Sequence, residues 1–317
     1  MACRAATAAR VIAVLCAGML SQSLQWARSA ESPAPAARAA AGSDWFLRLP
    51  KEEQVVFRGA ASFDGAGLDS PAMLYPAPNL AGFLAALATH ALILDTQRSN
   101  QGKKIQETAD QVLAPYRSVL NGYTHRDLMQ QALGRSPGAA TGRLVESPDR
   151  GTGGLIVESL PVFAMTQDQT ALILDNAVAI YAPGAASAAY RNIVRVVSPP
   201  QRRTDLVSFW TAGNGEALKA ESARLLAESL ELALQDMATA QKSGNPHRTV
   251  RYFEGTGERM ERGQIISDGC RQVVLRNLRG WLMAVPPRPG TVPAAAACGD
   301  TPGEQRSGET ANKSENP

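Results

Sequence analysis

Four β-branched-rich runs between residues 155 and 197 constrain the fold of this chain more than any other part of its sequence. They cover residues 155–157, 162–165, 171–181 and 193–197, and turn residues separate each run from the next. Asp168-Gln169 is one of these turns. Consecutive strands with such short connections pair antiparallel with their neighbours in the chain. The sequence therefore predicts a central antiparallel β-meander.

Helical patterns flank this meander on both sides. The clearest covers residues 216–241, where a wide apolar stripe repeats at helical spacing and Gly244 and Pro246 follow as stop signals. Before the meander, apolar residues at the same spacing predict a core helix over residues 80–94 and further helix within 103–133. We therefore expect a helical N-terminal half and a long amphipathic helix after the meander.

The last segment that we expect to be folded is predicted to form β-sheet. Between Thr249 and Val285, Gly255-Thr256-Gly257 and Ser267-Asp268-Gly269 have the composition of hairpin turns. The predicted fold class is α+β: a helical N-terminal half, a central antiparallel β-meander, a long amphipathic helix and a C-terminal β-hairpin or sheet segment. One domain is expected over residues 44–285, with residues 242–248 as a candidate sub-boundary.

The first thirty residues predict a cleavable secretory signal peptide. Arg4 and Arg10 supply positive charge, residues 11–20 are apolar, and small residues end the segment at 27–30. The apolar run is half as long as the roughly 20 residues that a spanning helix needs. A retained N-terminal anchor is one alternative. Lipidation of Cys16 is another, disfavoured because a bulky leucine precedes that cysteine.

Export sets the expected compartment and charge of the mature protein. Residues 1–30 hold three arginines and no acidic residue, so their removal brings the formal net charge from +3 to zero. A neutral protein has no overall field to attract a polyanion, which argues against nucleic acid as a partner. We expect a periplasmic protein with a flexible leader at 31–43 and a disordered tail at 286–317.

The cysteines agree with an oxidising compartment. Cys3 and Cys16 leave with the predicted signal peptide, and Cys270 and Cys298 remain. A disulfide between these two would close a loop of about 29 residues and contribute roughly 3.5 kcal/mol on the chain-entropy model. Two unpaired thiols are the alternative.

No motif for catalysis, metal binding or cofactor binding stands out. His90, His125 and His247 share no metal-ligand spacing, and no Gly-x-Ser-x-Gly elbow is present. Cys270 follows an Asp-Gly turn and has only Arg271 as a neighbouring cation, which is weak support for a nucleophile. We predict no cofactor and no metal site, and we lean against an enzyme.

Arginines gather in the C-terminal sheet segment and form a candidate partner-binding patch. Guanidinium groups suit carboxylate or phosphate partners, such as an envelope protein, a cell-wall polymer or a lipid head group. The alternative is that they pair with local acids along a sheet edge and discourage aggregation. The candidate residues are Arg248, Arg251, Arg271, Arg276 and Arg279.

Three stretches together carry a resemblance to known proteins. They are Tyr75–Pro78 running into Gly82–Leu84 and Thr89–Ala91; Ala109–Tyr116; and Cys270–Leu275 leading to Leu278–Met283. In these stretches the chain resembles exported envelope proteins of Gram-negative bacteria that carry no assigned activity. The resemblance implies export and transfers no catalytic residue and no ligand.

The favoured hypothesis is a non-catalytic accessory or binding protein of the periplasm or cell envelope. Its expected contact surfaces are the 80–94 helix and the arginine-rich C-terminal sheet. A periplasmic hydrolase with an unrecognised site is one alternative, because a fold can assemble distant residues into a catalytic group. A membrane-associated envelope assembly subunit is the other, and it requires the 80–94 helix to stay exposed.

Overall fold

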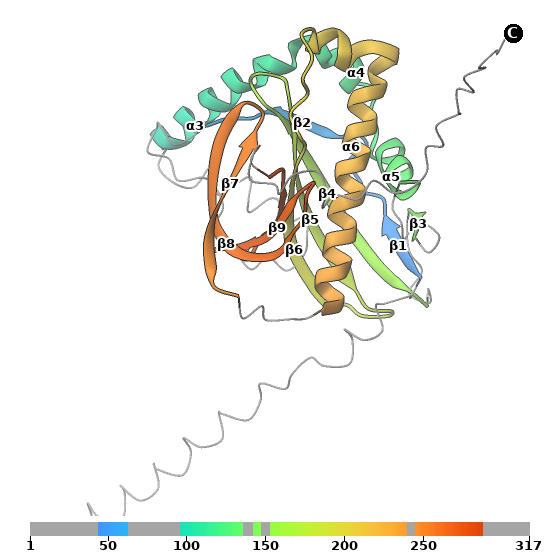
Figure 1. Ribbon diagram of the computed structural model, residues 1–317. Helices are drawn as coiled ribbons and strands as arrows, with labels where there is room; N and C mark the ends of the chain where they lie inside the picture. The colour runs from blue at the N-terminus through green and yellow to red at the C-terminus, as the bar shows by residue number, and fades with distance from the viewer. Residues whose placement is uncertain (1–43, 63–95, 136–141, 147–152, 240–244, 288–317) are drawn as a thin grey trace, which may run out of the picture.

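A single mixed β-sheet of ten strands organises the described part of the chain (Figure 1). The computed structural model describes residues 44–62, 96–135, 142–146, 153–239 and 245–287. The strands are β1 (Trp45–Arg48), β2 (Val56–Gly59), β3 (Gly142–Val145), β4 (Leu155–Met165), β5 (Leu172–Tyr181), β6 (Tyr190–Val197), β7 (His247–Glu254), β8 (Gly257–Asp268), β9 (Val273–Asn277) and β10 (Leu282–Val285). Their spatial order is β3-β1-β4-β5-β6-β10-β9-β8-β7, and β2 also pairs with β4.

The long strands β4, β5 and β6 form an antiparallel meander at the centre of the sheet. β4 alternates between buried and half-buried residues along its whole length, as a strand with one face on a core does. β5 is buried at nearly every position because its side chains enter hydrophobic clusters on both faces of the sheet. The β4–β5 turn falls at Asp168 and Gln169, and Gln169 adopts a φ of 60°.

The helices lie before and after this meander. They are α3 (Thr96–Ala109), the 3-10 helix η3 (Asp110–Tyr116), α4 (Arg117–Leu120), α5 (His125–Leu133) and α6 (Leu206–Thr239). Pro115 lies inside η3, where the tighter winding replaces a regular α-helix. Thr124 caps α5 by accepting a hydrogen bond from the Asp127 backbone at 3.1 Å. None of the helices within these described ranges is long and apolar enough to cross a membrane.

Helix α6 covers one face of the meander and buries the main core with it (Figure 1). Leu218, Leu226 and Leu230 on the helix belong to the same buried cluster as Val178 and Val196 on the strands. Burying each such side chain contributes roughly 1.5–3 kcal/mol. This apolar cluster therefore holds α6 on the sheet.

A short chain of polar side chains crosses the same interface. Ser159 donates a hydrogen bond to Asn176 at 2.8 Å, and Asn176 donates one to Ser229 of α6 at 2.9 Å. All three side chains are buried. Each of these polar groups has a hydrogen-bond partner, so the hydrogen bonds offset the free-energy cost of burying them. The network fixes the position of α6 along β5.

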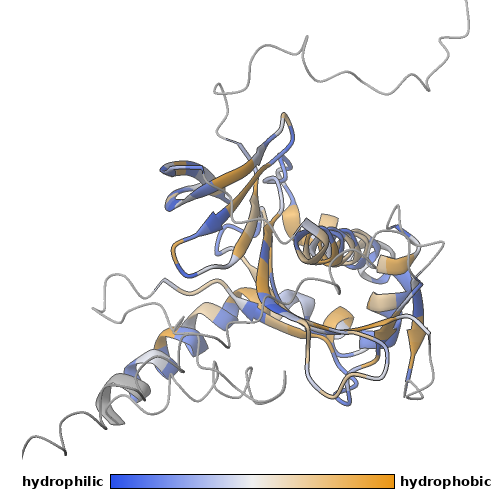
Figure 2. Ribbon diagram, turned by 90° about the horizontal axis from the view of Figure 1, so that it is seen from below, coloured by the Kyte–Doolittle hydropathy of each residue, from blue (hydrophilic) through white to orange (hydrophobic). Residues whose placement is uncertain are grey.

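Beyond β6 the sheet curls back over the face opposite α6 (Figure 2). Ile173 of β5 alternates with residues that face α6, so it points to the other side. There it packs with Val197 of β6 and with Val250 and Tyr252 of β7 in a second core. The β7–β8 hairpin is thus folded onto the central strands.

The expectation of a helical N-terminal half is wrong. Within the described residues this half contributes strands β1, β2 and β3 as well as short helices, and the fold is mostly sheet. Strands β1 and β2 have four residues each, and both pair in parallel with β4, about a hundred residues later. The predicted 103–133 helix is divided into η3, α4, α5 and the end of α3. The predicted 80–94 helix lies outside the described residues.

Candidate functional site

The five arginines predicted to form one patch occupy different parts of the C-terminal sheet. Arg248 and Arg251 lie on β7, Arg271 in the β8–β9 turn, Arg276 on β9 and Arg279 in the β9–β10 turn. Gly263 pairs with both Arg248 and Asn277, so Arg248 and Arg279 lie near the same end of β9. Arg271 lies at the other end of that strand. The structure therefore does not gather all five on one surface.

Arg276 has a structural partner on α6. It forms an ion pair with Asp236, whose other carboxylate oxygen accepts a hydrogen bond from the Tyr190 hydroxyl at 2.9 Å. Burial and the nearby Asp236 carboxylate raise the pKa of Tyr190, so this hydroxyl stays a donor. Arg276 thus ties β9 to the end of α6 through an acid on a helix, and not through one of the local acids of a sheet edge that the alternative named.

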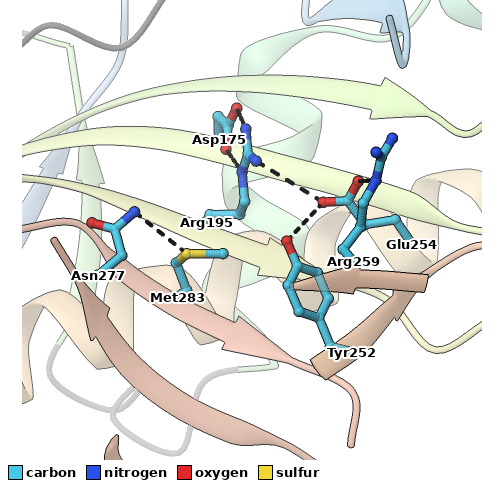
Figure 3. Close-up of polar contacts among 7 residues, drawn as sticks. All are labelled: Asp175, Arg195, Tyr252, Glu254, Arg259, Asn277 and Met283. Atoms are coloured by element: carbon cyan, nitrogen blue, oxygen red, sulfur yellow. Dashed lines mark hydrogen bonds and ion pairs between the residues drawn. The ribbon is translucent and has the colours of Figure 1, made fainter. Parts of the chain in front are cut away.

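A second set of polar contacts joins β7 to the central strands (Figure 3). Arg195 of β6 donates to both carboxylate oxygens of Asp175, at 2.6 and 2.7 Å, and lies 4.0 Å from Glu254 of β7. Tyr252 and Arg259 also donate to Glu254, at 3.1 and 3.2 Å. Two carboxylates balance two guanidinium groups in this cluster. Its role is to hold the hairpin, because each charge has an opposite neighbour.

Asp168 ties the tip of the same hairpin to the β4–β5 turn. Its carboxylate accepts hydrogen bonds from the hydroxyls of Thr166, Thr170 and Thr256 and from the backbone N–H groups of Thr170 and Thr256, at 2.6–3.0 Å. These donors lower the pKa of Asp168 well below its usual range, against the opposing effect of desolvation. Gly255 lies against this carboxylate, and a Cβ there would stand 2.6 Å from both oxygens.

We expect Asp168→Asn to lower the free energy of unfolding by about 1–2 kcal/mol at pH 7, a figure reduced for solvent screening. Because the folded-state pKa is depressed, the carboxylate stabilises the protein above its unfolded pKa near 3.9, and this contribution is lost as pH falls further. Urea unfolding of the unmodified protein and of the Asp168→Asn variant, at pH 7 and at pH 2.5, measures this contribution to the free energy of unfolding. The difference between them should shrink in acid, and Asp268→Asn, at an exposed site, should change stability by less than about 0.5 kcal/mol. A pH-independent difference would contradict the assignment.

The contacts at Glu254 and Asp168 hold the β7–β8 hairpin against the central strands. The outer face of the hairpin is exposed to solvent. We define this hairpin face by Arg251, Met260 and Arg262. Arg251 stands opposite Met260 in the ladder, and Arg262 lies two residues further along β8, so the three side chains share one face. Met260 is 63% exposed. Arg251 lies 3.8 Å from Glu258, a separation too long for a strong ion pair at an exposed site.

A shallow groove of about 870 Å³ lies at the start of α6, on another part of the molecule. Arg202, Arg203, Asp205 and Glu216 line it together with Phe209 and neighbouring small residues. The Arg203 guanidinium lies 4.5 Å from the centre of the Phe209 ring. Ser208 donates to Asp205 and lowers the pKa of that carboxylate, the arrangement of a helix cap. These contacts give Arg203 and Asp205 structural roles at the start of α6.

The described residues lend no specific support to the hydrolase alternative. His125 is buried, its Nδ1 lies 2.9 Å from the Glu52 carbonyl, and burial lowers its pKa. His247 begins β7, and His90 lies outside the described residues. No group of three or more histidine, cysteine or acidic side chains in the described ranges is placed to hold a metal ion.

Cys270 is disulfide-bonded. It lies in the β8–β9 turn, next to Arg271. Cys298 lies outside the described residues, so the predicted Cys270–Cys298 pairing stays a prediction. A cysteine held in a disulfide has no thiolate to act as a nucleophile.

Sequence reasoning directed attention to the arginines of this segment but missed Met260, the apolar residue of the hairpin face. A period-2 count from the predicted Gly255-Thr256-Gly257 turn could have placed all three on one side of the hairpin. Comparisons with models of protein families, with curated proteins and with solved structures found no match.

Proposed function

We propose that this protein is an exported, non-catalytic accessory protein of the bacterial cell envelope that binds a partner protein through the hairpin face. One observation carries the proposal: the side chain of Met260 is 63% exposed and lies beside Arg251 and Arg262 on the outer face of the hairpin. The polar contacts at Glu254 and Asp168 hold this hairpin against the central strands. Methionine and arginine are enriched in protein interfaces relative to the rest of the protein surface. The two guanidinium groups suit an acidic rim on the partner.

Two observations support export. The signal-like segment at residues 1–30 precedes the first described strand. The disulfide at Cys270 is typical of proteins that mature in an oxidising compartment. Together they favour the periplasm over the reducing cytosol.

Site-specific photo-crosslinking in the exporting cell tests the proposed surface. A photoreactive residue at position 260 should capture one partner protein, and Arg251→Glu with Arg262→Glu should lower its yield at least about tenfold, because each arginine contributes roughly 1–2 kcal/mol. Arg143 on β3, at the opposite edge of the sheet, provides the matched control.

Arg143→Glu should leave the crosslink from position 260 unchanged, and a photoreactive residue at position 143 should not produce it. Loss of the crosslink after Arg143→Glu, or equal capture from both positions, would reject the hairpin face. Capture of lipid or cell-wall polymer instead of protein would reject the stated partner class.

A further inference from the structure

Met260 differs from the other methionines that the structure describes in its exposure to solvent. It is 63% exposed on the hairpin face. The other four are each at most 7% exposed: Met129, Met165, Met237 and Met283. An oxidant has to reach a lone pair of the thioether sulfur, and the surrounding side chains deny that approach in the four buried residues. Within the described ranges, a dissolved oxidant therefore meets one methionine sulfur on the folded protein.

Met283 shows how a buried sulfur is protected (Figure 3). It lies on β10, is 1% exposed, and its sulfur accepts a hydrogen bond from the side-chain amide of Asn277 at 3.6 Å. Burial keeps a dissolved oxidant away from this sulfur, and the hydrogen bond occupies one of its lone pairs. Nothing among the described residues donates to the sulfur of Met260 in the same way. The two methionines therefore form a matched pair for a test of reactivity.

Two arginines flank Met260 on the hairpin face. Arg251 stands opposite Met260 in the ladder, and Arg262 lies two residues along β8. Opposite residues of a ladder have Cβ atoms about 4.5–5.5 Å apart, and alternate residues of one strand lie about 7 Å apart. Both spacings are within the reach of an arginine side chain. A thioether sulfur is a weak acceptor, so in the reduced protein it offers the guanidinium N–H groups little to bind.

We propose that Met260 is a site of reversible oxidation that controls binding at the hairpin face. Hydrogen peroxide is the oxidant: one of its oxygens bonds to the sulfur, the O–O bond breaks, and the sulfur gives up two electrons. Met260 becomes a sulfoxide, and the other oxygen leaves as water with both hydrogens of the peroxide. A thiol-dependent sulfoxide reductase reverses the change: two thiols become one disulfide, and the sulfoxide oxygen leaves as water.

Oxidation would change both properties on which the proposed interface depends. A sulfoxide is polar, so the apolar contact of the face would be lost. Its oxygen is a strong acceptor, and the guanidinium groups of Arg251 and Arg262 would donate to it in place of an acidic rim on the partner. The inference therefore rests on the proposed function of the hairpin face and adds its regulation.

Peptide mapping of the mature protein after treatment with hydrogen peroxide tests the site itself. In the folded protein, Met260 should form its sulfoxide at least about tenfold faster than Met165 or Met283, because a buried sulfur reacts only when the structure opens. In urea the three rates should become similar, since unfolding exposes every sulfur. Equal rates at the three positions in the folded protein would overturn the site.

Photo-crosslinking from a neighbouring position tests the switch with Met260 in place. A photoreactive residue replaces Thr249, which is exposed and stands opposite Arg262 in the ladder. Exporting cells receive enough peroxide to oxidise part of the Met260 population and are then crosslinked, and the captured and free chains are mapped separately. Sulfoxide at Met260 should be at least about tenfold rarer in the captured chains. Sulfoxide at the other methionines is the internal control and should be equally common in both fractions.

The outcomes separate this switch from the proposed function. Depletion of sulfoxide at Met260 alone, among the captured chains, supports both. Equal sulfoxide fractions at Met260 in captured and free chains overturn the switch and leave the hairpin face standing as a binding surface. Equal depletion at every methionine also overturns the switch, because it would reflect general oxidative damage. Failure to capture any protein from position 249 or 260 before treatment overturns the hairpin face, and the switch with it, whatever the rate of Met260 oxidation.

Discussion

Replacing Gly59 with alanine is expected to lower the free energy of unfolding by at least about 3 kcal/mol. A Cβ at this position would lie 1.9 Å from the carbonyl oxygen of Ala109 and 2.3 Å from its carbonyl carbon. These are backbone atoms, so no side-chain rotation relieves the overlap. The backbone of Gly59 also donates to Asp110 at 2.8 Å and accepts from Gln106 at 3.0 Å, contacts that a displaced β2 would lose.

Thermal unfolding measures this effect against a matched glycine. For a domain of this size, 3 kcal/mol corresponds to a fall in Tm of about 6–12 °C. Gly122→Ala introduces the same methyl group with no atom within 4 Å of it, and it should change Tm by no more than about 2 °C. Equal Tm values for the two variants would show that β2 does not contact the junction of α3 and η3 as described.

Gly215→Ala is expected to have a similarly large effect, with two separable causes. Gly215 has a φ of 78°, a conformation that costs an L-residue about 1–2 kcal/mol. The new methyl carbon would also lie 2.1 Å from Cγ1 of the buried Val119. The backbone leaves the helical conformation at residues 212–215 within α6. We therefore expect the free energy of unfolding to fall by more than about 3 kcal/mol, because this segment could neither relax nor move away from α4.

A double-mutant cycle separates the two causes. In a Val119→Ala background the close contact is relieved, so Gly215→Ala should cost only the 1–2 kcal/mol of its backbone conformation. Gly213→Ala has the same left-handed backbone and meets only the flexible Glu216 side chain, at 3.2 Å, so it should also cost about 1–2 kcal/mol. An equal cost of Gly215→Ala in both backgrounds would contradict the contact with Val119.

The hairpin face shows what sequence reasoning could and could not reach about the candidate site. Arginine clustering directed attention to the C-terminal sheet, and Arg251 lies on the exposed face. Arg276 has the same local sequence character, yet it forms an ion pair with Asp236 of α6. Side-chain type alone does not separate an exposed arginine from a paired one, because the partner lies forty residues away in the chain.

By itself, the sequence determined the elements that depend on local order. The antiparallel pairing of β4 with β5 and of β5 with β6 follows from β-branched-rich runs and short turns, and the Thr124 cap follows from the spacing to Asp127. Only the tertiary structure decided where β1 and β2 pair, how the sheet curls over Ile173, and why Gly59 has no room for a methyl group. Those features arise from contacts between segments distant in the chain. Their free energy comes from packing and from hydrogen bonds such as those to Asp168, which no local pattern of residues encodes.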